Sequence, residues 1–234
     1  MADVRTPLPQ AVLFDMDGTL LDTEVVWFQA QCEFAEDLGF TWVDDDQTEC
    51  LGGPLERVAR HIVVRSGTTR HHADVGQELL DRVEALLLAL PVMWRPGARD
   101  LLAEALGLGL PTALVTASDL RLVSAVLGRM ADELGAMPFA TLVTGEIVPR
   151  GKPHPDPYLM AADALGVDAS ACLALEDSPT GARSAWDAGC RVVAVPHIAA
   201  MPDDIDPHEV ESLEGHTIAS LWQASRSRAD ARSY

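Results

Sequence analysis

Few positive charges, few cysteines and no long hydrophobic run characterise this sequence, and each absence narrows what the protein can be. The sequence contains 17 Lys and Arg residues and 36 Asp and Glu residues, which gives a net charge of −19 at pH 7. A chain this acidic is not expected to bind nucleic acid, which is itself a polyanion. The four cysteines include no Cys-x-x-Cys pair, a pattern that favours free thiols in a reducing compartment over disulfides.

The sequence also shows no signal for secretion or membrane insertion. The first ten residues lack the apolar core of a signal peptide. Nowhere do roughly 18 apolar residues follow one another, the length that a membrane-spanning helix requires. We therefore expect a cytoplasmic protein that does not enter a membrane. Its 234 residues suffice for one large domain or for a core with a smaller insertion.

The stretch AVLFDMDGTLLD at residues 11–22 carries the strongest chemical signal. An apolar run typical of a buried strand leads into Asp15 and Asp17, and Gly18 and Thr19 end it. Residues two apart on an extended backbone point the same way, so we expect the two carboxylates to lie close together. A hard cation, which prefers oxygen ligands, would relieve their repulsion. A calcium-binding loop also begins with Asp-x-Asp-Gly, but there a helix precedes the loop and a Glu follows about a dozen residues on.

After this strand the sequence first predicts helices only. Apolar residues recur at helical spacing over residues 24–38, and further helices are expected over 57–64 and 75–90. We therefore assign residues 23–94 to a small helical insertion. The acidic run at residues 44–46 could bind a metal, but we interpret it as a solvated loop or a helix cap.

From residue 98 onward, helices and strands alternate. Expected helices cover residues 98–106, 119–134, 155–165 and 179–188, and expected strands cover 111–115, 139–143, 171–175 and 191–195. Such alternation implies parallel strands joined by right-handed crossovers, hence an α/β core. We assign this core to residues 1–22 and 95–223, and we expect the polar tail at residues 224–234 to be disordered.

Polar residues follow the other predicted strands, at the edge of the sheet where ligands of α/β proteins bind. The hydroxyls of Thr116 and Ser118 could bind a phosphoryl oxygen, although capping of the next helix is the commoner use. Lys152 lies in Gly-Lys-Pro-His-Pro-Asp, and its ammonium suits the charge on a transferring phosphoryl group. Glu176 and Asp177 follow the strand at 171–175, where adjacent carboxylates are costly without a cation.

Together these four segments resemble, in the same order, the four motifs of the haloacid-dehalogenase-like (HAD) phosphohydrolases, over residues 11–196. The resemblance implies a Rossmann-like parallel sheet with helices on both faces and a small α-helical cap inserted after the first strand. It also implies that Asp15 attacks phosphorus to form an aspartyl-phosphate. Asp17 would protonate the leaving group and then activate the water that hydrolyses this intermediate.

The same resemblance implies a Mg²⁺ site and a phosphate site. The Mg²⁺ ligands would be Asp15, the backbone carbonyl of Asp17, Asp177, and Glu176 either directly or through water. Mg²⁺ commonly retains several waters, so few protein ligands suffice. Thr116 and Lys152 would bind the oxygens of the phosphoryl group, with Ser118 beside them.

The helical insertion resembles the cap of the subfamily that contains β-phosphoglucomutase and small phosphatases, a cap that closes over the site and supplies substrate contacts. The candidates for these contacts are Glu24, Trp27, Gly53 and Arg57. In the mutases a His occupies the place of Trp27. An Arg that grips a second phosphate would fall at Glu56, one residue before Arg57. These departures favour a phosphatase over a mutase.

We therefore predict a Mg²⁺-dependent phosphatase that hydrolyses a small phosphorylated metabolite, such as a sugar phosphate, and that is a monomer or a weak dimer. Asp17 argues against the haloacid dehalogenases proper, whose chemistry does not use an acid/base Asp at that place. Phosphonatases rely on a cap lysine, and residues 23–94 contain no Lys. A mutase of the β-phosphoglucomutase type is the main alternative, and a non-catalytic protein that binds phosphate or metal is a remote one.

Overall fold

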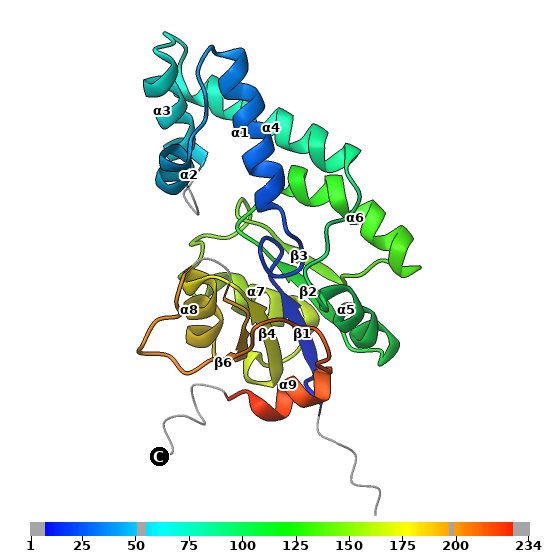
Figure 1. The fold of residues 1–234 in the computed structure, drawn as a ribbon. Helices are drawn as coiled ribbons and strands as arrows, with labels where there is room; N and C mark the ends of the chain where they lie inside the picture. The colour runs from blue at the N-terminus through cyan, green and yellow to red at the C-terminus, as the bar shows by residue number, and fades with distance from the viewer. Residues whose placement is uncertain (1–7, 51–54, 197–198, 227–234) are drawn as a thin grey trace, which may run out of the picture. The chain divides into compact units, whose positions relative to one another are not determined.

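The computed structural model of the protein describes residues 8–50, 55–196 and 199–226 (Figure 1). The chain divides into two compact units. Unit 1 combines Met1–Asp22 with Val92–Tyr234, and unit 2 is Thr23–Pro91. The backbone of Leu21 pairs with that of Trp94, which ties the two segments of unit 1 together where the chain leaves it and returns.

Unit 1 is built on a six-stranded sheet of order β3-β2-β1-β4-β5-β6, in which every neighbouring pair is parallel. The strands are β1 (Ala11–Phe14), β2 (Thr112–Val115), β3 (Thr141–Val143), β4 (Cys172–Glu176), β5 (Arg191–Ala194) and β6 (His208–Glu209). The residues of β1, β2 and β4 are all buried, as the continuous apolar runs predict. The predicted α/β core with a parallel sheet is confirmed.

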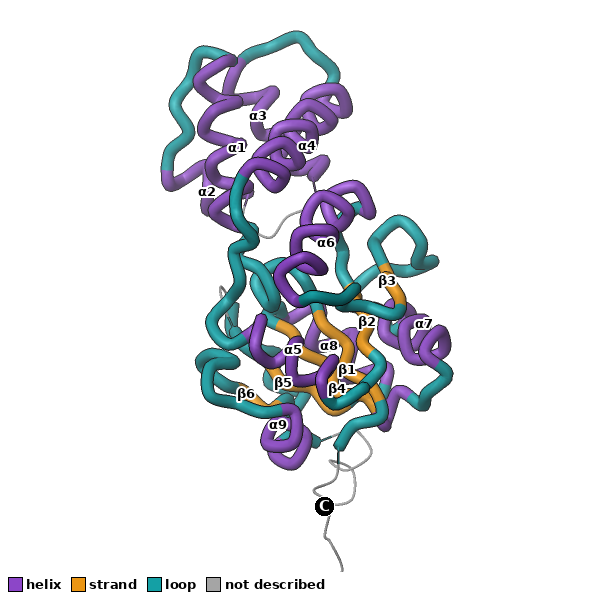
Figure 2. The backbone as a smooth tube through the Cα atoms, turned by 90° about the vertical axis from the view of Figure 1, so that its right-hand side faces the viewer, coloured by secondary structure: helices purple, strands orange, loops and turns teal. Residues whose placement is uncertain are grey.

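Helices cover both faces of this sheet. They are α5 (Ala98–Gly107), α6 (Leu120–Leu134), α7 (Asp156–Leu165), α8 (Pro179–Ala188) and α9 (Ile218–Ala224), with a 3-10 turn at Ala169–Ala171. Side chains of α7 and α8, among them Tyr158 and Trp186, share one apolar core with Leu13 and Ala174 of the central strands. Figures 1 and 2 place α5 on the opposite side of the sheet from α8.

The described part of unit 2 consists of helices and their connecting loops. The helices are α1 (Glu24–Asp37), α2 (Asp44–Cys50), α3 (Leu55–Ser66) and α4 (His72–Ala89). Helix α4 packs against both α1 and α3 around apolar side chains such as Phe34, Ile62 and Leu79, which are completely or almost completely buried. The three helices expected from the sequence are therefore present, and α2 is an additional one.

Helix α2 decides between the two interpretations of the acidic run at residues 44–46, a solvated loop and a helix cap. Asp44 and Asp45 are exposed in its first turn, where negative charge favours a helix N-terminus. Asp46 is instead buried and accepts a hydrogen bond from the backbone N–H of Val43 (3.0 Å). The helix-cap interpretation therefore fits the run, whereas the solvated-loop interpretation fails because the run is helical and its third carboxylate turns into the unit.

The C-terminal part of unit 1 also departs from the expectation. Strand β6 and helix α9 were not predicted, because each is short and its pattern is weak. Ala224 ends α9 and Ser225 is buried, so the predicted disordered tail does not begin at residue 224. The remainder of that tail, from residue 227, lies outside the described residues. Among the helices that the structure describes, we find none with the length and apolar character needed to cross a membrane.

Candidate active site

The carboxyl ends of three adjacent strands bring the predicted site residues of unit 1 together. Strand β1 lies between β2 and β4, and all three run in the same direction. Asp15 directly follows β1, Thr116 follows β2, and Glu176 is the last residue of β4. The N–H of Asp15 donates to the carbonyl of Leu175 (3.1 Å), which extends the sheet by one residue. The backbone therefore fixes where these side chains begin.

Lys152 occupies the centre of this edge. Its Nζ donates to Asp15 Oδ1 (2.6 Å), to Glu176 Oε1 (2.6 Å) and to the carbonyl of Val115 (2.8 Å). An ammonium has three donors, so all of them are used. Its side chain is only 6% exposed, and burial alone would lower its pKa. The charges of Asp15 and Glu176 outweigh this effect and raise the pKa of Lys152 above its usual range.

A short loop in front of α7 holds Lys152 in this position. Arg150 Nε and one of its terminal nitrogens donate to the two carboxylate oxygens of Asp156 (2.9 and 3.1 Å). Within the loop, the N–H of His154 donates to the carbonyl of Gly151 (2.9 Å), and Ser184 Oγ donates to the carbonyl of His154 (2.5 Å).

Lys152 is moreover the only lysine in the chain, a signal in the sequence that sharpens its assignment.

Glu176 is completely buried, and both of its carboxylate oxygens accept hydrogen bonds. Oε1 accepts from Lys152 and from the hydroxyl of Tyr158 (2.5 Å), and Oε2 accepts from Ser178 Oγ (3.2 Å). The backbone of Gly181 passes so close that a Cβ there would lie 2.0 Å from both oxygens. Tyr158 was not among the residues predicted for the site, because an aromatic residue in an apolar helix is typical of a core position.

The turn after β1 packs against Asp177. Thr19 Oγ1 donates to Asp177 Oδ1 (3.2 Å), and both residues are buried. Gly18 has a φ of +82°, and a Cβ at this position would lie 2.1 Å from Asp177 Oδ2. Glycine is therefore required at this position both by the backbone conformation and by the approach of the carboxylate.

Asp15, Glu176 and Asp177 together form a set of oxygen ligands that could hold a metal ion. One ligand atom from each lies within 4.8 Å of the others, and all three residues are buried. Burial raises the pKa of Asp15 well above its usual range despite the nearby Lys152. Burial and the charge of Glu176 raise the pKa of Asp177 to about 7. A divalent cation would offset the cost of burying these carboxylates in their charged form. Ligands that are all oxygen suit Mg²⁺ or Ca²⁺.

Asp17, two residues after Asp15, meets two hydroxyl groups that follow β2. Ser118 Oγ donates to Asp17 Oδ2 (2.6 Å), and Thr116 Oγ1 approaches the same oxygen (3.3 Å). The N–H of Ser118 in turn donates to Thr116 Oγ1 (2.9 Å). The structure thus brings Thr116 and Ser118 to the site as predicted, but their contacts here are with a carboxylate.

The four residues predicted to contact substrate from the cap belong to unit 2. Glu24 and Trp27 are half-buried on α1, and Arg57 is exposed on α3. Gly53 lies outside the described residues. For these four residues the substrate contact stays a prediction.

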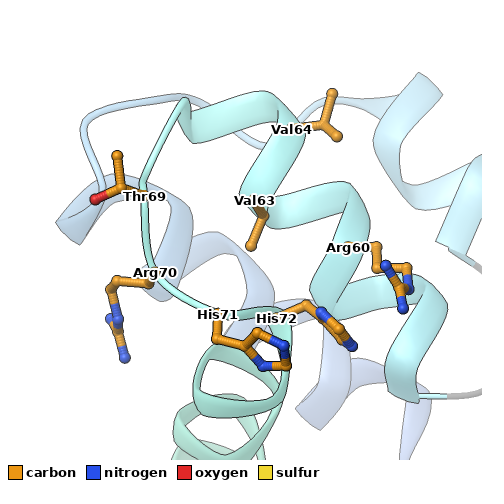
Figure 3. A pocket seen from close by; sticks show the side chains of 7 residues that line it. All are labelled: Arg60, Val63, Val64, Thr69, Arg70, His71 and His72. Atoms are coloured by element: carbon orange, nitrogen blue, oxygen red, sulfur yellow. The ribbon is translucent and has the colours of Figure 1, made fainter.

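A pocket in unit 2 is explained by contacts within that unit (Figure 3). Its lining residues are Arg60, Val63, Val64, Thr69, Arg70, His71 and His72. Arg60 is paired with Glu56 (2.6 Å) and Arg70 with Glu78 (2.6 Å). His71 accepts a hydrogen bond from the N–H of Ala73 at the start of α4 (3.2 Å). The cationic groups of this pocket are thus occupied in holding α3 and α4, so we do not take it as the active site.

Comparison with known proteins agrees with this geometry. Residues 9–189 match the haloacid dehalogenase-like hydrolases. Protein CbbY of Rhodobacter capsulatus is 34% identical over 201 residues, which cover 83% of this chain and 88% of that protein. Hexitol phosphatase B of Escherichia coli K12 is 34% identical over 203 residues, which cover 82% of this chain and 86% of that protein.

A solved structure shows the same fold. The crystal structure of a CbbY mutant from Rhodobacter sphaeroides in complex with xylulose-(1,5)-bisphosphate superposes with a TM-score of 0.74 at 30% sequence identity. The match covers 92% of this chain and 99% of that one. The family match spans the four strand-end segments that carry the site residues, and the relatives extend it over most of the chain. This protein is therefore a member of the haloacid dehalogenase-like hydrolase family.

Proposed function

We propose that this hydrolase is a Mg²⁺-dependent phosphatase that cleaves a small phosphorylated metabolite through an aspartyl-phosphate. One observation carries the proposal: the buried carboxylate of Asp15 lies 2.6 Å from the ammonium of Lys152, beside the further carboxylates of Glu176 and Asp177. This arrangement combines a nucleophile, a fixed cation and ligands for a metal ion. The relatives named as phosphatases support the same reaction class.

In the first step, a carboxylate oxygen of Asp15 attacks phosphorus while the bond from phosphorus to the leaving oxygen breaks. Asp17 gives its proton to that oxygen, so the product leaves as an alcohol. In the second step, Asp17 takes a proton from water, and the resulting hydroxide attacks phosphorus. The bond to Asp15 breaks, inorganic phosphate leaves, and the Asp15 carboxylate is restored.

The hydroxyls around Asp17 fit this double role. Because Ser118 and Thr116 both contact Asp17 Oδ2, they hold the carboxylate in one orientation beside the nucleophile. The family resemblance implies that Thr116, with Ser118 beside it, also donates to the phosphoryl group. When substrate binds, Lys152 would exchange one of its three hydrogen bonds for one to another phosphoryl oxygen, and its positive charge offsets charge that develops in the transition state.

The oxygen ligands fit Mg²⁺, which we propose as the cofactor. Asp15, the backbone carbonyl of Asp17 and Asp177 would hold the ion, with Glu176 as a direct or water-mediated ligand. When bound, Mg²⁺ supplies positive charge that neutralises the crowded carboxylates and the phosphate. The residues of this chain then hold the phosphoryl group, attack it and move the protons.

We propose a phosphorylated sugar or polyol as the substrate class. Support comes from the relative named hexitol phosphatase and from the CbbY complex with a sugar bisphosphate. In our proposal the cap residues Glu24, Trp27, Gly53 and Arg57 distinguish among such substrates. This assignment rests on the family resemblance.

The direct test is phosphate release from a panel of phosphorylated sugars, polyols, nucleotides and cofactors, measured with Mg²⁺ and again with EDTA. We expect release from sugar or polyol phosphates that EDTA abolishes and added Mg²⁺ restores. Conversion of a hexose 1-phosphate in the presence of a bisphosphate, without phosphate release, would instead identify a mutase. Binding of Mg²⁺ without turnover of any compound would identify a non-catalytic protein.

A further inference from the structure

Tyr158 is a completely buried side chain of α7 whose hydroxyl reaches the charges of the site. It donates to Glu176 Oε1 at 2.5 Å, and that same oxygen accepts from Lys152 Nζ at 2.6 Å. The Lys152 ammonium also lies 5.5 Å from the centroid of the tyrosine ring. Tyr158 therefore contacts both members of the Glu176–Lys152 pair. Neither the proposed chemistry nor the metal site accounts for this hydroxyl.

Packing alone does not account for the hydroxyl group. The ring shares a core with Leu13, Ala174 and Trp186, and a phenylalanine would fill the same space. A buried hydroxyl without a partner is costly, so it has to be matched by an acceptor. Here the acceptor is a fully buried carboxylate, and hydrogen bonds to charged groups are the strong ones. The hydroxyl thus contributes a specific, strong interaction at the site.

Glu176 decides where the Lys152 ammonium lies. One acceptor of Lys152 is a backbone carbonyl fixed in β2, that of Val115, and a second, Asp15 Oδ1, belongs to a short side chain directly after β1. The third acceptor, the carboxylate of Glu176, lies at the end of a flexible side chain. Tyr158 on one oxygen and Ser178 on the other prevent this carboxylate from turning. A Glu176 that could turn would draw the ammonium away from Asp15.

We propose that Tyr158 is a positioning residue, which fixes Glu176 and thereby holds Lys152 against the nucleophile Asp15. The inference rests on the proposed phosphatase function for its kinetic consequence. The effect of the Tyr158 hydroxyl on the position of Lys152 does not depend on that function. In this role Tyr158 itself touches neither the reacting phosphorus nor the leaving group.

The kinetic test compares two variants that each lose one buried hydroxyl. Tyr158→Phe removes the donor to Glu176, and the matched control Thr112→Val removes a donor to the carbonyl of Pro138 at the other end of β2. We expect Tyr158→Phe to lower kcat about tenfold, because a displaced Lys152 stabilises the transition state less, with KM changed less than about twofold. Thr112→Val should leave kcat within about twofold of wild type even where its melting temperature falls equally. An equal loss of kcat in both variants would overturn the proposal.

A second readout needs no activity, because the chain has a single lysine. In protein labelled with ¹⁵N-lysine, one ammonium signal reports on Lys152, and its chemical shift and proton-exchange rate follow its hydrogen bonds. We expect Tyr158→Phe to move this signal and speed its exchange, and Thr112→Val to leave it in place. An unmoved signal in folded Tyr158→Phe would overturn the proposal.

The same signal covers two other outcomes. Should Tyr158→Phe fail to fold, 3-fluorotyrosine at the chain's two tyrosines keeps the ring and hydroxyl but makes the donor more acidic. This substitution is expected to shift the Lys152 signal, and no shift would contradict the proposal. If wild-type protein hydrolysed no phosphoester, the proposed function would fail, while the lysine signal would still decide the role of Tyr158.

Discussion

Each of the two units contains a cluster of charged side chains built on buried carboxylates, and the two clusters differ in their balance of charge. In unit 1 the Lys152 cluster consists of Asp15, Lys152, Glu176 and Asp177. In unit 2 the Asp46 cluster consists of Asp46, His61 and Arg65, with Asp46 Oδ1 2.7 Å from His61 Nε2 and 3.0 Å from an Arg65 nitrogen. Among the described residues, three carboxylates share one lysine in the first cluster, whereas one carboxylate meets two basic side chains in the second.

This difference appears again in the pKa values of the carboxyl groups. Burial raises the pKa of Asp177 to about 7, and the positive charge of Lys152 is not enough to reverse this increase. Burial alone would also raise the pKa of Asp46. There the hydrogen bonds from His61 and from the Val43 N–H, with the charge of Arg65, lower the pKa below its ordinary value. The balanced cluster joins α2 to α3, while a buried cluster with surplus negative charge indicates a site for a cation.

The largest effect is expected from Asp15→Asn, which removes both the nucleophile and one of the surplus charges. Phosphate release should fall at least about a thousandfold, as it does when a catalytic nucleophile is lost. Without metal the melting temperature should stay equal or rise, because a buried charge that repels its neighbours is gone. The exposed Asp45→Asn in unit 2 serves as the matched control with normal activity. If Asp15→Asn retained a tenth of wild-type activity, Asp15 could not be the nucleophile.

The next largest effect concerns pH and Mg²⁺. Without metal, folded Asp177 titrates near pH 7, well above its ordinary 3.8, so the native state holds more protons than the unfolded state between these values. The free energy of unfolding should therefore decrease as pH rises from about 4 to about 7, by at most about 4 kcal/mol from this group. The raised pKa of Asp15 acts in the same direction.

Bound Mg²⁺ takes the place of the proton, so its stabilising effect should grow across the same pH range. The measurement is urea denaturation at several pH values from 5 to 8, with Mg²⁺ and with EDTA. We expect the difference between the two conditions to be small at pH 5 and largest at pH 8. An equal Mg²⁺ effect at both ends would mean that the surplus charge is not what the ion neutralises.

A smaller effect is expected from Asp46→Asn in the balanced cluster. It leaves His61 and Arg65 without their carboxylate and should lower the free energy of unfolding by about 1–3 kcal/mol. The value lies below that of a deeply buried pair because Arg65 is 37% exposed. Since folded Asp46 has a lowered pKa, its contribution is complete above about pH 4 and is lost as pH falls through the folded value. Urea denaturation of Asp46→Asn and Asp45→Asn measures the effect, and equal stabilities at pH 7 would contradict it.

The sequence predicts the residues of the site better than it predicts their contacts. Asp15, Thr116, Lys152 and Glu176 each lie next to the end of a strand or in a distinctive short segment, and a parallel sheet necessarily gathers strand ends at one edge. The local pattern therefore sufficed to predict that these residues lie together. The roles assigned to them remain proposals.

Contacts between side chains of separate elements could not be predicted in this way. Tyr158 meets Glu176 across 18 positions of sequence, and only the packing of α7 on the sheet brings them together. Asp46 belongs to an acidic run that resembles a solvated segment, and its partners come from a different helix. Such contacts depend on side-chain orientation, which the periodicity of one element does not contain.

Calorimetric titration of Mg²⁺ into the wild-type protein, Asp177→Asn and Asp46→Asn tests most directly whether the Lys152 cluster binds the cation. We expect one Mg²⁺ to bind to wild type and to Asp46→Asn with the same affinity. Asp177→Asn, which lacks a ligand and part of the surplus charge, should bind at least about tenfold more weakly, a loss of about 1.4 kcal/mol. Equal affinity in Asp177→Asn, or a loss only in Asp46→Asn, would contradict the claim that the Lys152 cluster is the cation site.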